Sequence, residues 1–473
     1  MVRENYQLRN QTITDSQLRF ILAEQVDALK NKVFGKSSER YKKPKRDDDG
    51  DDKKDAKPRV KRPSERYPDI AVRQEIIEMS PSPSCPCCGE VMTDSGMTED
   101  SEQLTVIPKK YEVLLQKRKK YRCECEGAIT TAPMPPRIVP GSTYSDEMIL
   151  DIALSKYCDL IPIGRYAAMA ARSGLIDLPA NSLIETTHPF ADFVSPVYTL
   201  IKEGALSSRV LKADETPHRM LEGDDKKSWY LWGFSSTLYC YLECRDTRSG
   251  DVASDMLTNK KSKCEILVSD VYSGYRKATR LSNEIRRSLK QPLIFNAYCN
   301  AHSRRKFYHA FPKYNEAAFY LDHYHEIYQL NSKAKDKPPD IILGLRAQME
   351  ARFKAMKQRA LEELSGHSNK GKYGRALKYF INNYDGLTLF LTDAEVPIDN
   401  NAQERNFRSY VVGRKTWYGT HSKRGALTAA ILFSIVETCK LNGVNPREYF
   451  KCLLEDLLAG AKPYTPADFK KSH

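Results

Sequence analysis

The chain has 473 residues, a formal net charge of +14 and 10% aromatic residues. The 23 glycines and 25 prolines are too few for a collagen-like or low-complexity chain, and the aromatic content argues against intrinsic disorder. The length predicts about three or four domains. The excess of lysine and arginine favours an anionic partner, and nucleic acid is the first expectation.

No run of about 18 apolar residues occurs, so we expect no membrane span. The stretch Thr428–Cys439 is predicted to be a buried or amphipathic helix. The first ten residues contain no apolar core of a secretion signal. Five of the 12 cysteines cluster in one short segment, and the others are scattered. This distribution predicts a cytoplasmic protein with one metal site rather than a disulfide scaffold.

Residues 1–35 are predicted to form one helix. Its apolar residues recur at spacings of three and four, namely Leu18, Leu22, Val26, Leu29 and Val33. This seam predicts either a short coiled coil between two chains or a helix packed on its own chain. Residues 36–80 follow as a linker of mixed charge with few apolar residues, which is typical of flexible chain.

Residues 81–135 are predicted to form a zinc-binding module that contacts DNA. The zinc ligands are expected to be two cysteine pairs, Cys85 with Cys88 and Cys123 with Cys125. Thiolates on two short turns suit tetrahedral zinc, although Cys87 could replace either member of the first pair, and free buried thiols are the alternative. Between the pairs, residues 103–115 have a strand-like pattern. A basic stretch that suits phosphate contacts follows, containing Lys117, Arg118, Lys119 and Lys120.

Residues 136–203 have a helical pattern. Met148, Ile149 and Ile152 share one face, a second helix is expected near Tyr166–Arg172, and Gly174 marks a turn. Asn181 or Ser182 could cap a further helix. The pattern predicts a DNA-binding helix-turn-helix, with a purely structural helical hairpin as the equal alternative.

Residues 204–300 are predicted to form the first part of an α/β core. A helix is expected at Asp251–Leu257, and the expected strands are 209–214, 228–234, 237–244, 264–270 and 293–298. Three antiparallel strands, a helix, a parallel strand, a helix and a further strand follow the order of the RNase H-like fold. In that fold the first and fourth strands are neighbours, so Asp214 and Asp270, which end them, would face each other.

Two facing carboxylates repel each other unless a cation lies between them. Mg²⁺, or Mn²⁺, prefers such oxygen ligands. We expect Glu404 to add the third carboxylate of a two-metal phosphodiester site. It lies in a helix that Asp399 or Asn400 could cap, with Asn400, Glu404 and Arg408 on one face. His302 could also approach the site, or act as a structural hydrogen bonder.

Residues 301–395 are predicted to be a helical insertion, and residues 396–473 the catalytic helix with Glu404 and a C-terminal helical region. Basic residues flank both regions. The candidates for DNA contact are Arg304, Arg305, Arg405, Arg408, Arg414 and Lys415, with Trp417 available for base stacking. The predicted whole is a multidomain α/β protein with an RNase H-like core, a helical insertion, a small zinc-binding domain and an N-terminal helix.

Taken together, the sequence motifs of this chain resemble those of the bacterial insertion-sequence transposases of the sixty-six family, in the large subunit that carries the DDE triad. The resemblance covers nearly the whole chain. The matching strings are Phe34–Arg40, Cys85–Gly89, Ser155–Tyr157, Ala213–Pro217, Asp270 with Tyr272–Tyr275, Ala301–Phe307, Asp399–Arg405, Gly413–Lys415 and Glu437–Val444. Two positions depart from the family pattern: the second cysteine pair is Cys123-x-Cys125 rather than C-x-x-C, and Asn300 replaces a bulky apolar residue.

The resemblance implies an RNase H-like core with Asp214, Asp270 and Glu404 as its triad, a zinc-binding domain before it, and accessory proteins of the same element. The expected activity is cleavage at the element ends and joining of the freed 3′-hydroxyls to target DNA. Pairing two ends calls for at least a dimer. The alternatives are a nuclease that cleaves without joining, and a non-catalytic DNA-binding regulator. The expected location is the bacterial cytoplasm, with the nucleoid.

Overall fold

The computed structural model describes residues 62–80, 82–94, 96–122, 128–221, 228–366 and 371–472. The predicted helix at 1–35, most of the linker at 36–80, and both Cys123 and Cys125 therefore lie outside the described residues. The chain divides into two compact units, Met1–Val106 and Ile107–His473.

In the first unit, the described residues contain a single turn of helix and a cysteine knuckle. Helix α3 (Pro63–Arg66) is held by Ser64, whose backbone N–H and hydroxyl both donate to the Glu102 carboxylate at 2.8 Å. In the knuckle, the Gly89 N–H donates to the Cys85 carbonyl at 3.0 Å and the Cys85 N–H to the Glu90 carbonyl at 2.7 Å. Gly89 has a φ of +78°, a conformation that glycine adopts without steric cost.

The second unit is built around a five-stranded mixed sheet with the order β5-β4-β3-β6-β7. Strand β3 pairs antiparallel with β4 and parallel with β6, β4 pairs antiparallel with β5, and β6 pairs parallel with β7. The strands are β3 (Val210–Arg219), β4 (Ser228–Ser235), β5 (Cys240–Arg245), β6 (Ile266–Ser269) and β7 (Phe295–Tyr298). Five strands were predicted at these places, and all five are present.

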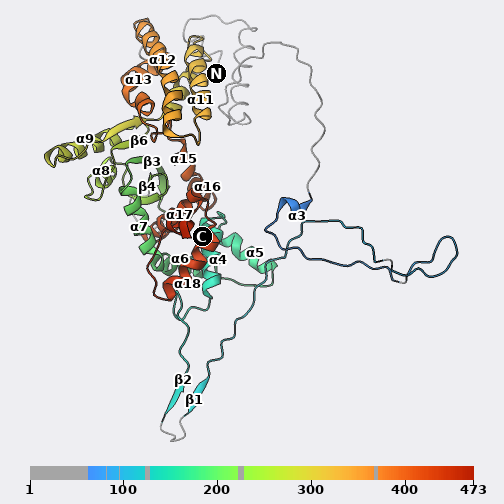
Figure 1. Ribbon diagram of the computed structural model, residues 1–473. Coiled ribbons are helices and arrows are strands. Elements are labelled where there is room, and N and C mark those ends of the chain that lie inside the picture. The colour runs from blue at the N-terminus through green and yellow to red at the C-terminus, as the bar shows by residue number, and fades with distance from the viewer. Residues whose placement is uncertain are drawn as a thin grey trace, which may run out of the picture. The chain divides into compact units, whose positions relative to one another are not determined.

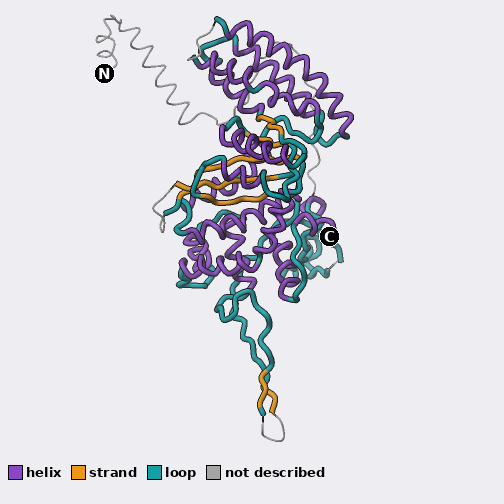
Figure 2. The backbone as a smooth tube through the Cα atoms, turned by 90° about the vertical axis from the view of Figure 1, so that its left-hand side faces the viewer, coloured by secondary structure: helices purple, strands orange, loops and turns teal. Residues whose placement is uncertain are grey.

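Helices lie on both sides of the sheet (Figure 2). On one face, the Trp232 ring of β4 meets the Tyr275 ring in an edge-to-face contact, with centroids 5.9 Å apart. At the open edge of β5, the Leu242 backbone accepts a hydrogen bond from the Tyr198 hydroxyl and donates one to Ser434. The helices are α8 (Asp251–Leu257) and α9 (Ser273–Ser288) on the face of Tyr275, and α7 (Ser195–Leu206) and α17 (Lys423–Asn442) along β5.

Strand β3 is longer than predicted. It continues past Asp214 to Arg219, because β4 pairs with it throughout, from Lys212 to Arg219. Its parallel partner β6 ends at Ser269, so the later half of β3 is an edge on that side. Pro217, which has no N–H to donate, lies in this edge half, where a missing donor is tolerated. Asp214 thus lies just after the end of the parallel pairing, in the middle of the strand.

Four helices precede the sheet: α4 (Asp146–Tyr157), α5 (Ile163–Arg172), α6 (Ala180–Phe193) and α7. Ile152, Ile163, Tyr166 and Leu183 form a buried cluster that joins the first three. The predicted turn at Gly174 is present, with a φ of +91°. The predicted cap at Asn181 or Ser182 is wrong, because α6 begins at Ala180 after Pro179 and has no side-chain cap.

The segment after β7 is helical, as predicted, and α11, α12 and α13 pack side by side (Figure 1). Buried rings join them, with Phe307 stacked on Tyr320 at a centroid distance of 4.2 Å and Phe353 stacked on Phe380. The elements are α10 (Asn300–Ala310), α11 (Ala317–Lys333), α12 (Pro339–Leu364), α13 (Lys372–Asn382), α14 (Tyr384–Thr388) and the 3-10 helix η1 (Leu389–Thr392).

Helix α17 is long and apolar enough to cross a membrane, but 78% of that apolar stretch is buried inside the unit. Its Ser434 and Thr438 hydroxyls both bond to backbone groups of β5. These are the contacts of a core helix, and they confirm the buried helix predicted at Thr428–Cys439.

The strand predicted at residues 103–115 is absent. Only two short strands form in this region, β1 (Lys120–Arg122) and β2 (Ile129–Thr131), which pair antiparallel. Apolar side chains of the predicted strand, such as Val113 at 95% exposure, pack against nothing. Alternation of residue types alone cannot hold an extended segment that has neither a paired edge nor a covered face.

Candidate functional site

The carboxyl ends of the three parallel strands define the candidate active site. The paired register between β3 and β6 ends with Lys212 opposite Val268, and Asp214 and Asp270 each lie two residues beyond that pair. Between β6 and β7, Ser269 is opposite Tyr298, which places Cys299 next to Asp270. The Cys299 N–H also donates to the Ser269 carbonyl at 3.1 Å. One row across the sheet therefore holds Asp214, Asp270 and Cys299.

Helix α15 (Asn401–Asn406) brings Glu404 to this edge. Asn400, just before the helix, is buried and donates through its side chain to the Ala213 carbonyl at 2.9 Å. The predicted capping role of Asn400 is therefore wrong, because its side chain bonds to β3 and makes no cap hydrogen bond. The predicted face with Arg408 is also interrupted, since α15 ends at Asn406 and Arg408 begins α16 (Arg408–Trp417).

Gly233 of β4 allows α15 to approach the sheet closely. A Cβ added at Gly233 would lie 2.3 Å from Nε2 of Gln403 and 2.6 Å from the Phe407 ring. The Gln403 side chain is fully buried and accepts a hydrogen bond from the Ser235 hydroxyl. Sequence reasoning did not identify Gly233 or Gln403, although a glycine inside a strand often marks a close approach of another element.

The electrostatics of Asp214 reflect both its burial and its acidic neighbours. Burial is the largest cause that raises the pKa of Asp214 to about 7, and the charges of Glu215, Asp270 and Glu404 contribute to the same rise. A carboxyl that is desolvated and surrounded by other carboxylates is stabilised by a divalent cation. The donor set also consists of oxygen ligands, so the residues fit Mg²⁺.

Glu215 is a fourth carboxylate at this edge, and sequence reasoning gave it no separate role. Its side chain is only 2% exposed. It accepts hydrogen bonds from the Tyr275 hydroxyl at 2.5 Å and from Arg248 at 2.7 Å. Burial raises the pKa of Glu215, while these two donors lower it and Asp270 raises it. Because its oxygens already accept hydrogen bonds, Glu215 is better suited to holding the neighbouring side chains at this edge of the sheet in place than to binding a cation.

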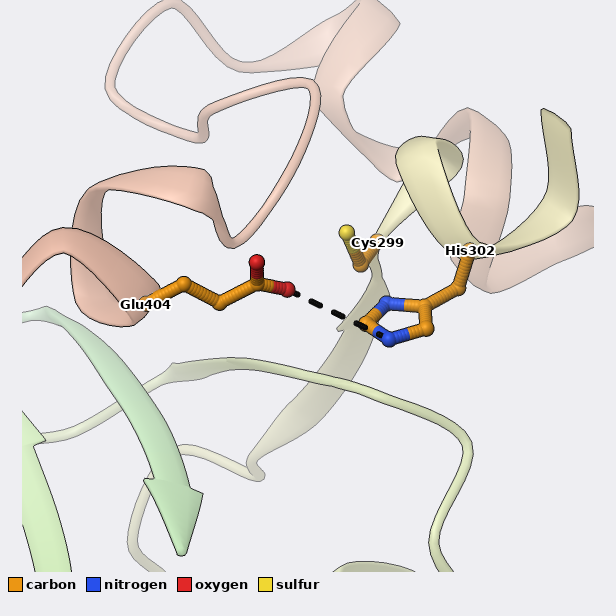
Figure 3. A group of neighbouring side chains, drawn as sticks. All are labelled: Cys299, His302 and Glu404. Carbon is orange, nitrogen blue, oxygen red and sulfur yellow. Dashed lines mark ion pairs between the residues drawn. The ribbon is translucent and has the colours of Figure 1, made fainter. Parts of the chain in front are cut away.

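His302 lies beside Glu404, as the sequence suggested it could. Its Nε2 is 4.0 Å from a carboxylate oxygen of Glu404 (Figure 3). Cys299, His302 and Glu404 offer ligand atoms that all lie within 4.8 Å of one another. Sequence reasoning did not predict that Cys299 belongs to this group, because it placed the cysteine only at the start of the helix that follows the strand 293–298.

The predicted DNA-contacting residues lie in two places within the second unit. Lys117 to Lys120 are exposed at and before β1. Arg304 and Arg305 are half-buried on α10, while Arg405, Arg408 and Lys415 are exposed on α15 and α16. Arg414 donates to the Thr216 hydroxyl at 3.1 Å, which ties α16 to β3. The second group thus lies on the elements that carry or adjoin Glu404, and DNA contact by either group stays a prediction.

Trp417 packs within the unit. Its ring meets the Lys156 ammonium at 4.8 Å and contacts Gly413, where a Cβ would lie 2.3 Å from the ring. The neighbouring Tyr418 is 70% exposed and has a φ of +66°. Base stacking by Trp417 stays a prediction, and Tyr418 presents the more accessible ring.

His218 joins β3 to the first turn of α16 and to the residues that follow that helix. Its Nδ1 pairs with the Tyr410 hydroxyl and its Nε2 with the Thr420 hydroxyl at 2.7 Å. Burial, with a smaller contribution from the nearby Arg414 charge, lowers the pKa of His218 to about 4. The imidazole is therefore neutral in the folded protein at neutral pH.

This buried histidine predicts an acid-sensitive stability. In the unfolded chain His218 binds a proton below about pH 6.5, which is its ordinary pKa. In the folded chain it binds that proton only below about pH 4. The free energy of unfolding should fall by roughly 3 kcal/mol across this range through this group. Thermal unfolding from pH 7.5 to 4.5 should show a shallower loss for His218→Gln than for the native chain. The exposed His309→Gln should keep the native slope, and equal slopes for all three proteins would contradict the prediction.

The knuckle in the first unit carries one predicted cysteine pair. Backbone N–H groups of Cys88 and Cys87 lower the pKa of the Cys85 thiol, as does the side chain of Cys88. Such donors stabilise a thiolate, which is the form that binds zinc. The geometry leaves both Cys87 and Cys88 available as partners of Cys85, and Cys123 and Cys125 lie outside the described residues.

The comparisons with known proteins agree with both units. Residues 141–428 match the model of the transposase IS66 family, and residues 82–126 match the zinc-finger binding domain of transposase IS66. The chain therefore belongs to the IS66 family of transposases, and the second match supports zinc binding and DNA binding by residues 82–126.

Relatives occur in Sinorhizobium fredii (strain NBRC 101917 / NGR234). The uncharacterized protein y4hP is 26% identical over 426 residues, which cover 84% of this chain and 74% of the relative. The uncharacterized protein y4qI is 27% identical over 403 residues, which cover 82% and 72%.

Proposed function

We propose that this protein is a DDE-type DNA transposase with an RNase H-like core, in which Asp214, Asp270 and Glu404 form the catalytic triad. The strand order and directions support this core, since three antiparallel strands are followed by two parallel ones. The observation that carries the proposal is geometric: the parallel strands β3 and β6 lead to Asp214 and Asp270 at one edge of the sheet, and the Asn400 bond to Ala213 brings the helix of Glu404 to that edge.

The three carboxylates would hold Mg²⁺ or Mn²⁺. When bound, such ions activate water and stabilise the charge that develops on a phosphodiester. The residues of the chain do the positioning. Strands β3 and β6 fix Asp214 and Asp270, and Asn400 anchors the approach of Glu404 through the Ala213 carbonyl. This rigid placement favours in-line attack, first by water on the element end and then by the freed 3′-hydroxyl on target DNA.

The proposal includes DNA at both stages of the reaction. The family and its zinc-finger domain support DNA binding, and we assign the element ends and the target to the basic residues around Glu404 and to the zinc module. The domain limits given above, the helix-turn-helix role of residues 136–203, a dimer at least, and accessory proteins of the same element belong to this proposal. A transposase of bacterial DNA would act in the cytoplasm, at the nucleoid.

A strand-transfer assay tests the proposal. The full-length protein is incubated with Mg²⁺, a duplex ending in the element's terminal repeat and a supercoiled target plasmid. We expect cleavage at the element end and a covalently joined product. Cleavage without any joined product would indicate a nuclease instead. A footprint on the terminal repeat without cleavage in Mg²⁺ or Mn²⁺ would indicate a non-catalytic regulator.

A further inference from the structure

Beside the row of carboxylates lies a second set of potential metal ligands with a different chemical character. Cys299, His302 and Glu404 come from the end of β7, the first turn of α10 and the middle of α15. Figure 3 shows the three side chains converging, with a nitrogen edge of the imidazole turned towards the carboxylate. Their ligand atoms lie within 4.8 Å of one another. In tetrahedral zinc sites such atoms are about 3.5 Å apart. Side-chain movements of about an ångström would therefore bring the three ligand atoms to the spacing that zinc needs.

The backbone around these residues is fixed. Cys299 is fully buried, its N–H bonds to Ser269, and its sulfur accepts a hydrogen bond from the Asn400 N–H at 3.2 Å. Burial raises the pKa of the Cys299 thiol to about 12 although the Asn400 N–H opposes this shift, so a thiolate ligand would need the charge of a bound cation to stabilise it. His302 follows three residues later, one helical turn along. Cys299 and His302 are therefore close in sequence. The Asn400 N–H, which bonds to the Cys299 sulfur, holds the helix of Glu404 against them.

The polar atoms of the group are incompletely satisfied. Among the described residues, Nδ1 of His302 is buried and has no hydrogen-bond partner. An unpaired buried nitrogen carries a desolvation penalty that a ligand can remove. The His302 and Glu404 side chains are nevertheless 31% and 36% exposed. A cation can therefore enter from solvent, and the fourth coordination position remains open to water.

The chemistry of the donors separates this set from the catalytic one. Sulfur, imidazole nitrogen and carboxylate oxygen together suit borderline cations such as Zn²⁺, whereas Asp214 and Asp270 offer only the hard oxygens that Mg²⁺ prefers. Glu404 is common to both sets. We propose that Cys299, His302 and Glu404 bind a borderline divalent cation such as Zn²⁺, and that this cation competes with Mg²⁺ for Glu404.

The binding half of the proposal is tested by metal content. The full-length protein is equilibrated with a low-micromolar excess of Zn²⁺, dialysed and analysed for bound zinc per chain. We expect Cys299→Ser and His302→Gln each to lose about one equivalent relative to the native chain. Cys264→Ser controls for the loss of another buried thiol, and His309→Gln for a histidine on the same helix. Equal zinc content in the native chain, Cys299→Ser and His302→Gln would overturn the site.

The competition half rests on the proposed function and is tested by Mg²⁺-dependent cleavage with increasing Zn²⁺. Each variant is compared with its own rate before Zn²⁺ is added. We expect the half-inhibiting Zn²⁺ concentration to rise at least tenfold in Cys299→Ser and His302→Gln, and to stay unchanged in Cys264→Ser. Unchanged inhibition in the first two variants would refute competition at this site. If the native chain cleaves nothing, the proposed function and competition both fail, and the zinc content alone decides the binding site.

Discussion

Asp214→Asn is expected to abolish Mg²⁺-dependent cleavage of element-end DNA, lowering its rate at least about a thousandfold. A metal-binding carboxylate contributes several kcal/mol of transition-state stabilisation, and roughly 1.4 kcal/mol corresponds to a factor of ten. Binding of the same DNA should change little, because the basic residues that are predicted to contact it are untouched. The measurement pairs a cleavage time course with a binding titration on one duplex.

The same variant should be more stable than the native chain in the absence of divalent cations. Asp214 has a folded-state pKa of about 7, raised by burial and neighbouring carboxylates. An ionised Asp214 therefore opposes folding above that pH, and the penalty shrinks as pH falls and the folded state takes up the proton. The thermal midpoint of Asp214→Asn should exceed the native value by a few degrees at pH 8, and by less at pH 5.

A matched control separates the site from a general effect of charge removal. Asp255 on α8 is 66% exposed and makes only a long contact, at 3.6 Å, with Arg245. Asp255→Asn should cleave DNA at the native rate and keep the native thermal midpoint. Cleavage by Asp214→Asn at the rate of this control would refute the triad assignment.

Gly233→Ala is expected to impair cleavage although it touches no carboxylate. The added Cβ would meet the side-chain ends of Gln403 at 2.3 Å and Phe407 at 2.6 Å. Because both side chains are buried, we expect α15 to shift with them. Glu404 lies on that helix, and a displacement of about an ångström at a catalytic group can cost about a hundredfold in rate. Overpacking should also lower the free energy of unfolding by about 1–3 kcal/mol.

Gly344→Ala is the matched control for this substitution. Gly344 is exposed on α12, and a Cβ there meets nothing within 4 Å. A glycine-to-alanine change inside a helix stabilises by about 0.5–1 kcal/mol. We therefore expect native cleavage and a slightly higher thermal midpoint for Gly344→Ala. If Gly233→Ala also cleaves at the native rate, the placement of Glu404 does not depend on the close approach at Gly233.

Much of the core could be predicted from the sequence because its strands carry strong local signals. Strand β6, with the buried run Ile266–Ser269, and aromatic-rich β4 are short apolar segments between turns, and their order restricts the topology. The order predicted that the strands leading to Asp214 and Asp270 are neighbours, and the parallel pairing of β3 with β6 confirms that the strands are adjacent. Catalysis by these residues stays a prediction.

The features of the fold and the site that could not be predicted depend on contacts between residues distant in sequence. Asn400 could serve as a helix cap by local rules, yet its amide bonds to Ala213, 187 positions earlier. Asn300, which departs from the family pattern, is buried and donates to the Leu387 and Ile398 carbonyls. Neither partner can be deduced from spacing. The absent strand at 103–115 shows the converse, because alternating residues formed no strand without a partner.

The Asn300 contacts have a consequence for how the helical insertion can vary. The Asn300 side chain joins the point where the insertion leaves the sheet to Ile398, where the chain returns. From α12, Arg346 donates to the Val396 carbonyl at 2.9 Å and to the Phe390 carbonyl at 2.6 Å. With its two ends fastened together, the insertion is a closed loop, and lengthening such a loop costs little entropy. Helices far from this fastening can thus be lengthened, shortened or exchanged without moving Glu404.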